Sequence, residues 1–197
     1  MINKSIWLVV VLSWAFALPN QYLTAGFNYS AIKYNQRSLN EQITVDFVRG
    51  YIFGFEYQWD RLQAGFRYSG RGAQSDLSDI AETRFISIEN YSYLEVYGVY
   101  KRPIRNGRFS LLLGPQMGIP LGGSYVINTA TFSANGSISR GSLNMDLGLH
   151  GGIDWDMHQF VGVRCLYYLG LIDINKAVPK SENVKNRGLS LIFYFGL

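Results

Sequence analysis

The sequence has little charge, a single cysteine and no long apolar run, and each shortage excludes a class of protein. Charged residues make up 16% of the 197 residues, against roughly 25% in an ordinary soluble domain. The lone Cys165 excludes an intrachain disulfide. No apolar run reaches the roughly 18 residues of a membrane-spanning helix. Part of the surface is therefore expected to avoid water without a spanning helix.

What the chain has in quantity is aromatic residues and glycine. Aromatics make up 15% of the sequence, 21 residues are glycine, and the mean hydropathy is +0.01. A membrane β-barrel has such a composition, because its apolar surface is spread over alternate residues and never forms a continuous apolar run.

The N-terminus has the pattern of a cleavable signal peptide. Lys4 precedes an apolar run of about 13 residues, and Ala15-Phe16-Ala17 has the small-x-small form that signal peptidase requires. The run is too short for an anchor helix. We therefore predict a signal peptide at residues 1–17 and an outer-membrane β-barrel domain at residues 18–197.

Eight segments of the remaining chain alternate apolar and polar residues with a period of two. In the third segment, for example, Leu62, Ala64 and Phe66 alternate with polar residues and glycine. Pro115 lies within the fifth segment and predicts a bulge or a local break there. The eight segments are 22–32, 47–59, 62–70, 91–102, 108–119, 143–155, 160–169 and 188–197.

The connections between these segments are alternately long and short. Short ones are expected at 60–61, 103–107 and 156–159, and long ones at 34–46, 71–90, 120–142 and 171–187. Outer-membrane barrels have this arrangement, with tight periplasmic turns and long outer loops. The prediction is an all-β fold, an eight-stranded antiparallel up-and-down transmembrane β-barrel whose two ends lie in the periplasm.

Two glycine-containing stretches are expected to lie in the connections. Gly70-Arg71-Gly72 is expected to be a turn where a strand ends. Residues 130–141, rich in Ser, Thr, Asn and Gly, are expected to form a mobile external loop.

The apolar face of the strands is expected to meet lipid. The alternative is a secreted, soluble, lipocalin-like barrel that holds an apolar ligand inside. Against it, the polar face is mostly Gly, Ser, Asn and Gln, and the apolar face has more large rings than a small barrel can enclose. Rings such as Trp59, Tyr100 and Trp155 also lie beside the short turns, where an aromatic girdle belongs.

Charged residues within the strands fall on the polar face, inside the barrel. An eight-stranded barrel has room only for side chains, and buried charges must pair. We therefore expect a structural polar network that plugs the lumen, and rank an ion path below it. The expected members are Glu56, Arg67, Glu95, Asp146, His150 and Arg164.

Little in the sequence points to catalysis. A lipid-modifying barrel enzyme would need a serine beside His150, and the sequence places none next to it. No cluster has metal-ligand spacing, and no basic helix suggests nucleic acid. The expectation is therefore no catalytic, cofactor or metal site, a non-enzymatic role, and contact with membrane lipid and envelope proteins.

The chain resembles the PorT-like outer-membrane β-barrel family of Bacteroidetes-type bacteria. The final strand has the polar-x-Gly-x-x-apolar-x-aromatic form of a barrel insertion signal between Asn186 and Phe193, although the last residue is Leu197. The resemblance covers the mature chain and is carried by Ala25-Gly26-Phe27-Asn28-Tyr29-Ser30, Leu62-Gln63-Ala64-Gly65-Phe66-Arg67-Tyr68-Ser69, Tyr93-Leu94-Glu95-Val96, Lys101-Arg102-Pro103 and Gly114-Pro115-Gln116-Met117-Gly118. It implies an outer-membrane location and, from the family's namesake, a role in protein secretion.

Overall fold

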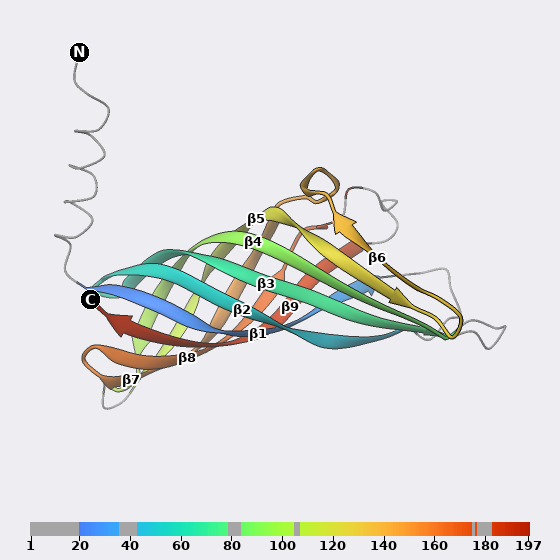
Figure 1. Ribbon diagram of the computed structural model, residues 1–197. Coiled ribbons are helices and arrows are strands. Elements are labelled where there is room, and N and C mark those ends of the chain that lie inside the picture. The colour runs from blue at the N-terminus through green and yellow to red at the C-terminus, as the bar shows by residue number, and fades with distance from the viewer. Residues whose placement is uncertain (1–19, 36–42, 79–83, 105–106, 175, 177–182) are drawn as a thin grey trace, which may run out of the picture.

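The strands of the protein wrap into a long β-barrel (Figure 1). The computed structural model describes residues 20–35, 43–78, 84–104, 107–174, 176 and 183–197. The predicted signal peptide, residues 1–17, lies outside the described residues. The elements are β1 (Gln21–Asn35), β2 (Ile43–Trp59), β3 (Leu62–Ser78), β4 (Arg84–Pro103), β5 (Phe109–Asn128), β6 (Ser133–Ile138), the 3₁₀ helix η1 (Arg140–Ser142), β7 (Asp146–His158), β8 (Val161–Gly170) and β9 (Asn183–Gly196).

Antiparallel pairing closes eight of these strands into a ring. The order is β4-β3-β2-β1-β9-β8-β7-β5, and β5 pairs back to β4. β6 pairs with β5 outside the ring. Short connections join β2 to β3, β4 to β5 and β7 to β8, and Leu197 donates a backbone hydrogen bond to Gln21 at the same end (2.9 Å). The predicted eight-stranded antiparallel barrel is confirmed.

No helix in the part of the chain that the structure describes is long and apolar enough to cross a membrane.

The barrel has polar residues inside and apolar residues outside. Along β5, exposed and buried residues alternate, so that Leu113 is 63% exposed while its neighbour Leu112 is 3% exposed. Charged and amide side chains are buried, whereas large hydrophobic residues on every strand of the ring face outward. This arrangement contradicts the lipocalin-like alternative, because the apolar side chains of such a barrel would line its interior. It suits a barrel surrounded by lipid.

Three strands continue well beyond the predicted membrane segments. β3 runs on to Ser78, β4 begins at Arg84, and β5 extends to Asn128. The stretch Gly70-Arg71-Gly72, predicted as a turn, is continuous strand paired with β4, so that prediction was wrong. Beyond the lipid-facing band the outward residues of a strand can be polar, so apolar and polar residues need not alternate in the sequence there.

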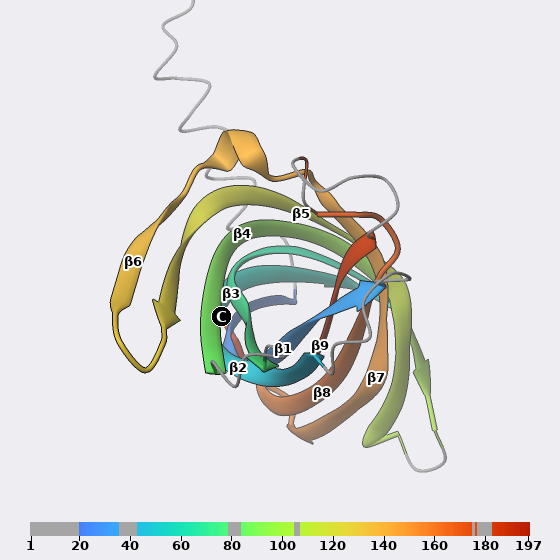
Figure 2. The ribbon, with the colours of Figure 1, turned by 90° about the vertical axis from the view of Figure 1, so that its right-hand side faces the viewer.

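These extensions and β6 form an external sheet beyond the barrel, made of β2, β3, β4, β5 and β6 (Figures 1 and 2). Among the described residues its edge strands are β2 and β6, because β1 pairs with β2 only as far as Val48, β7 pairs with β5 only as far as Gly118, and β6 pairs with β5 alone. β6 lies within residues 130–141, which were predicted to be a mobile loop. Uncharged polar residues there complete a hairpin with β5.

β5 stays continuous through Pro115, although this residue has no N–H to donate. The β4–β5 register is the same on both sides, from Tyr97 opposite Gln116 to Tyr100 opposite Leu113, with no pairs between them. Pro115 therefore interrupts the pairing with β4, whereas β5 itself is unbroken and Pro115 still lies opposite Leu149 of β7. The bulge lies elsewhere, where the register shifts between Ser92 and Tyr93.

A charge placed on the lipid-facing wall should destabilise the barrel. Leu113→Arg, near the middle of the apolar band, is expected to lower the free energy of unfolding in lipid vesicles by about 2–4 kcal/mol. Urea titration of tryptophan fluorescence measures this. The control is Phe132→Arg, at a similarly exposed position in the β5–β6 turn of the external sheet, which should change the free energy of unfolding by less than about 0.5 kcal/mol. Equal effects of the two variants would contradict the lipid-facing assignment.

Candidate functional site

The lumen is filled by a network of charged and polar side chains, and this is the candidate functional site. Four buried cations and four buried anions lie within it among the described residues, so the charges balance. They are Arg67, Arg71, Lys101, Arg164, Glu56, Glu95, Asp146 and Asp154.

The outer part of the network centres on Arg71. Its guanidinium pairs with both Glu95 and Asp146. Glu95 also pairs with Arg67 (2.5 Å), the residue directly opposite it on β3. The amide of Asn186 donates to Asp146 (2.9 Å). Because Arg71 lies on β3 and Asp146 on β7, this cluster joins opposite walls of the barrel.

The middle of the network is neutral. The carbonyl of Gln116 accepts from Arg67 (2.7 Å) and lies 2.8 Å from Nδ1 of His150. The His150 ring meets the ring of Tyr97 edge to face, with 5.5 Å between centroids. Tyr97 in turn donates to Glu56 (2.8 Å). Hydrogen bonds and this one ring contact therefore connect the outer charges to the inner ones.

The inner part, towards the short turns, centres on Arg164. It contacts both oxygens of Glu56 (2.6 and 3.1 Å), across the lumen from β8 to β2. It also contacts Asp154 (3.3 Å), its register partner on β7. Lys101 pairs with Asp154 (2.7 Å) and Asp156 (3.0 Å). A two-oxygen contact with arginine is a strong geometry for a buried carboxylate.

Tyrosine rings pack against the arginines and occupy the remaining lumen. Guanidinium carbons lie 4.1 Å from the ring centroid of Tyr168 for Arg71 and 5.1 Å from that of Tyr194 for Arg164. Glycine makes room for one of these rings, because a Cβ built on Gly162 would lie 2.0 Å from the hydroxyl of Tyr194. Cation–π contact thus adds to the ion pairs.

Little space remains within the lumen. A cavity of about 10 Å³ lies between Asn28, Arg67 and Ser190, which is room for about one water molecule. Further out, an apolar cluster lies above the network. Its buried members are Ile32, Ala73, Tyr91, Tyr93, Leu143, Ile174 and Val184.

The structure brings together all six residues expected from the sequence. Each is 3% exposed or less, and each contacts another member of the network through an ion pair or a hydrogen bond. The expected set lacked Arg71, Lys101 and Asp154. Arg71 was assigned to a turn because glycines flank it, whereas the inward parity of Lys101 and Asp154 could have revealed them.

A closed eight-stranded barrel with a polar, filled lumen and an apolar exterior defines a transmembrane β-barrel of the outer-membrane class. The family described as outer membrane protein beta-barrel domain matches residues 21–176. The chain belongs to this family, and its location is the outer membrane. Membership in the narrower PorT-like group is not part of that match.

Solved structures show the same fold. Neisserial surface protein A is 13% identical, with a TM-score of 0.52 over 90% of this chain and 97% of that chain. Ail, the attachment invasion locus protein of Yersinia pestis, is 16% identical, with a TM-score of 0.50 over 91% of this chain and 99% of that chain. No curated protein sequence matches significantly. At these identities the likeness extends to the fold alone.

Removing one member of a buried ion pair should strongly destabilise the barrel. Arg164→Met leaves Glu56 with Tyr97 as its remaining donor, and we expect the free energy of unfolding to fall by about 3–5 kcal/mol. Adding Glu56→Gln to this variant should recover part of the loss, since the unpaired charge is removed. The control is Arg108→Met, at an exposed position in a short turn. If Arg164→Met costs no more than the control, the network does not stabilise the fold.

Proposed function

We propose that this protein is a non-enzymatic structural or accessory component of the outer membrane, a plugged barrel that presents its external sheet to other envelope proteins. The observation that carries the proposal is the filled, charge-balanced lumen. Ion pairs that cross from wall to wall, such as Arg71 with Asp146, occupy the volume that a solute would need.

The position of His150 weighs against the alternative of a lipid-modifying enzyme. This residue is 1% exposed and lies among the interior side chains. Its Nδ1 faces the amide of Gln116, and its Nε2 makes no hydrogen bond with the described residues. A hydrolytic site would need a serine or threonine hydroxyl on the histidine and access to lipid. His150 has neither within the described structure.

The external sheet supports the accessory role. The outer edge of β6 pairs with no other described strand, and its sequence, Ser133 to Ile138, has no charge and no proline. Edge strands that must stay unpaired usually carry charged residues or proline, which prevent pairing with another strand. An unprotected edge can accept an extended segment of a partner protein through main-chain hydrogen bonds.

The PorT-like assignment and its link to protein secretion belong to the same proposal. Their support is the motifs of the sequence, among them Tyr93-Leu94-Glu95-Val96. The partners expected on this view are membrane lipid and envelope or secretion-system proteins. Nucleic acid is not expected among them.

The filled lumen predicts an electrically silent barrel. Purified, folded protein inserted in a planar lipid bilayer should give no stable conductance steps in potassium chloride, because the ion pairs leave no continuous water path. A porin of known conductance, added later to the same bilayer, shows that the membrane can report an open channel. Reproducible single-channel steps from the folded protein alone would overturn the proposal and favour a solute channel.

Cross-linking in the native membrane tests the accessory role. A photoreactive amino acid replaces Phe132, beside β6, or Met157, near a short turn; the two side chains are similarly exposed, at 55% and 49%. We expect discrete cross-links to another envelope protein from position 132 and none from position 157. Cross-links from position 157 alone, or from neither position, would contradict a role for the external sheet.

A further inference from the structure

Three basic residues lie on the outward face of one side of the barrel. They are Arg49 on β2 and Lys185 and Arg187 on β9, with β1 between the two strands. Arg49 is exposed, and the other two are half-buried. Between these residues and the short turns, the outward positions of the described strands carry one charged residue, Arg102 near the short-turn end of β4. The three cations are therefore a local feature of this side.

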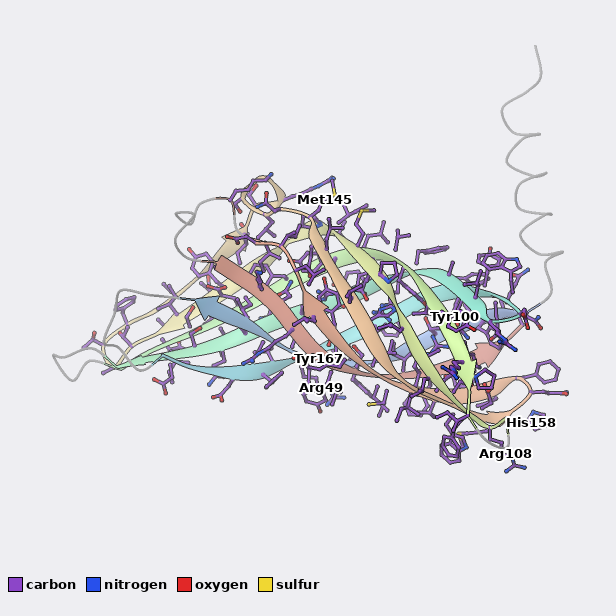
Figure 3. All side chains as sticks on the ribbon, turned by 180° about the vertical axis from the view of Figure 1, so that it is seen from behind. Arg49, Tyr100, Arg108, Met145, His158 and Tyr167 are labelled. Carbon is purple, nitrogen blue, oxygen red and sulfur yellow. The ribbon has the colours of Figure 1, made fainter. Side chains whose placement is uncertain are left out.

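The cations lie at the outer boundary of the apolar band. Arg49 is the register partner of Tyr29, in the row that continues through Leu189 to Tyr167. In Figure 3, Arg49 lies at the same level along the barrel axis as Tyr167, far from Arg108 and His158 at the short-turn end. From Arg49 to Trp59, beside a short turn, a tilted strand rises about 25 Å, the height of a barrel's apolar band.

Aromatic rings hold the two guanidinium groups against the wall. Arg49 lies over the ring of Phe27, 4.0 Å from its centroid, and beside Tyr51. Arg187 reaches across β1 towards the ring of Phe47 (5.8 Å). Ala31, its register partner on β1, is fully buried. The small residue on the middle strand thus lets the side chains from β9 and β2 approach each other.

No described carboxylate neutralises this patch. The acidic residues in the described parts of β1, β2 and β9 are Glu56 and Asp46. Glu56 is buried against Arg164 inside the barrel, and Asp46 lies further out, in the external sheet. Arg49, Arg187 and Lys185 have no ion pair within the described residues, so their charge is available to a ligand.

We propose that Arg49, Arg187 and Lys185 form a binding site for a phosphorylated glycolipid of the outer leaflet. Guanidinium groups bind phosphate oxygens in pairs. Arg49 and Arg187 lie two strand spacings apart across β1, with an offset of two residues in register, which puts their Cα atoms about 12 Å apart. Below them the wall is apolar, with Phe53 and Leu189 exposed to acyl chains. A ligand with phosphates at the interface and several acyl chains matches both halves of this surface. The site is independent of what the external sheet binds.

The test compares lipids that differ only in phosphate. Full-length mature protein, folded in zwitterionic micelles, is titrated with bis-phosphorylated lipid A, dephosphorylated lipid A or phosphatidylglycerol, and native mass spectrometry counts the bound lipids. We expect saturable one-to-one binding of the phosphorylated glycolipid. The double variant Arg49→Gln, Arg187→Gln should weaken it about tenfold or more. Arg102→Gln, an exposed arginine at the short-turn end of β4, is the matched control and should bind like the original protein.

Three results would overturn the site. They are equal binding of phosphorylated and dephosphorylated lipid A, equal binding of phosphatidylglycerol, or the same loss in Arg102→Gln as in the double variant. The first means that acyl contact alone governs binding, and the others mean unspecific attraction of anions. All variants are first shown to be folded by the heat-dependent shift of their gel mobility, so that a loss of binding is not a loss of structure.

Discussion

Neutralisation of charge across the lumen is the constraint on which the rest of this barrel depends. A charged group buried without a partner costs several kcal/mol, so each inward charge needs an opposite one within reach. Arg71 with Asp146 and Arg164 with Glu56 meet this need by joining opposite walls. Strand register, barrel size and the positions of the tyrosine rings must all be compatible with these contacts.

Because the lumen is filled, the surfaces that can bind other molecules lie on the outside of the barrel. A solute cannot share the space held by Arg67, Gln116 and His150, and the histidine is enclosed with them. The surfaces left for recognition are the external sheet, with its open β6 edge, and the lipid-facing wall. The cations at Arg49 and Arg187 distinguish one side of that wall from the others.

Most of the barrel could be predicted from the sequence, because a strand in a membrane must alternate. Residues such as Phe66 and Arg67 take opposite faces wherever their strand pairs. The short turn at 60–61 follows from the lengths of the segments, and the one predicted at 156–159 lies at 159–160, because β7 continues to His158. The external sheet could not be predicted in the same way. Beyond the apolar band the outward face of a strand no longer meets lipid and can be polar, so β6 and the outer part of β3 show no such alternation of apolar and polar residues in the sequence.

The sequence by itself determined the strand number, the end at which the termini lie and the inward parity of Glu56, Arg67, Glu95, Asp146, His150 and Arg164, since each depends on a local period of two. Which of these side chains meet was decided only by the tertiary structure. Closure of the ring sets the stagger between distant strands, so Arg164 reaches Glu56 and Arg71 enters the network. The same stagger places Arg49 and Arg187 on either side of β1, two residues apart in register. Register over several strands cannot be determined from one strand's pattern.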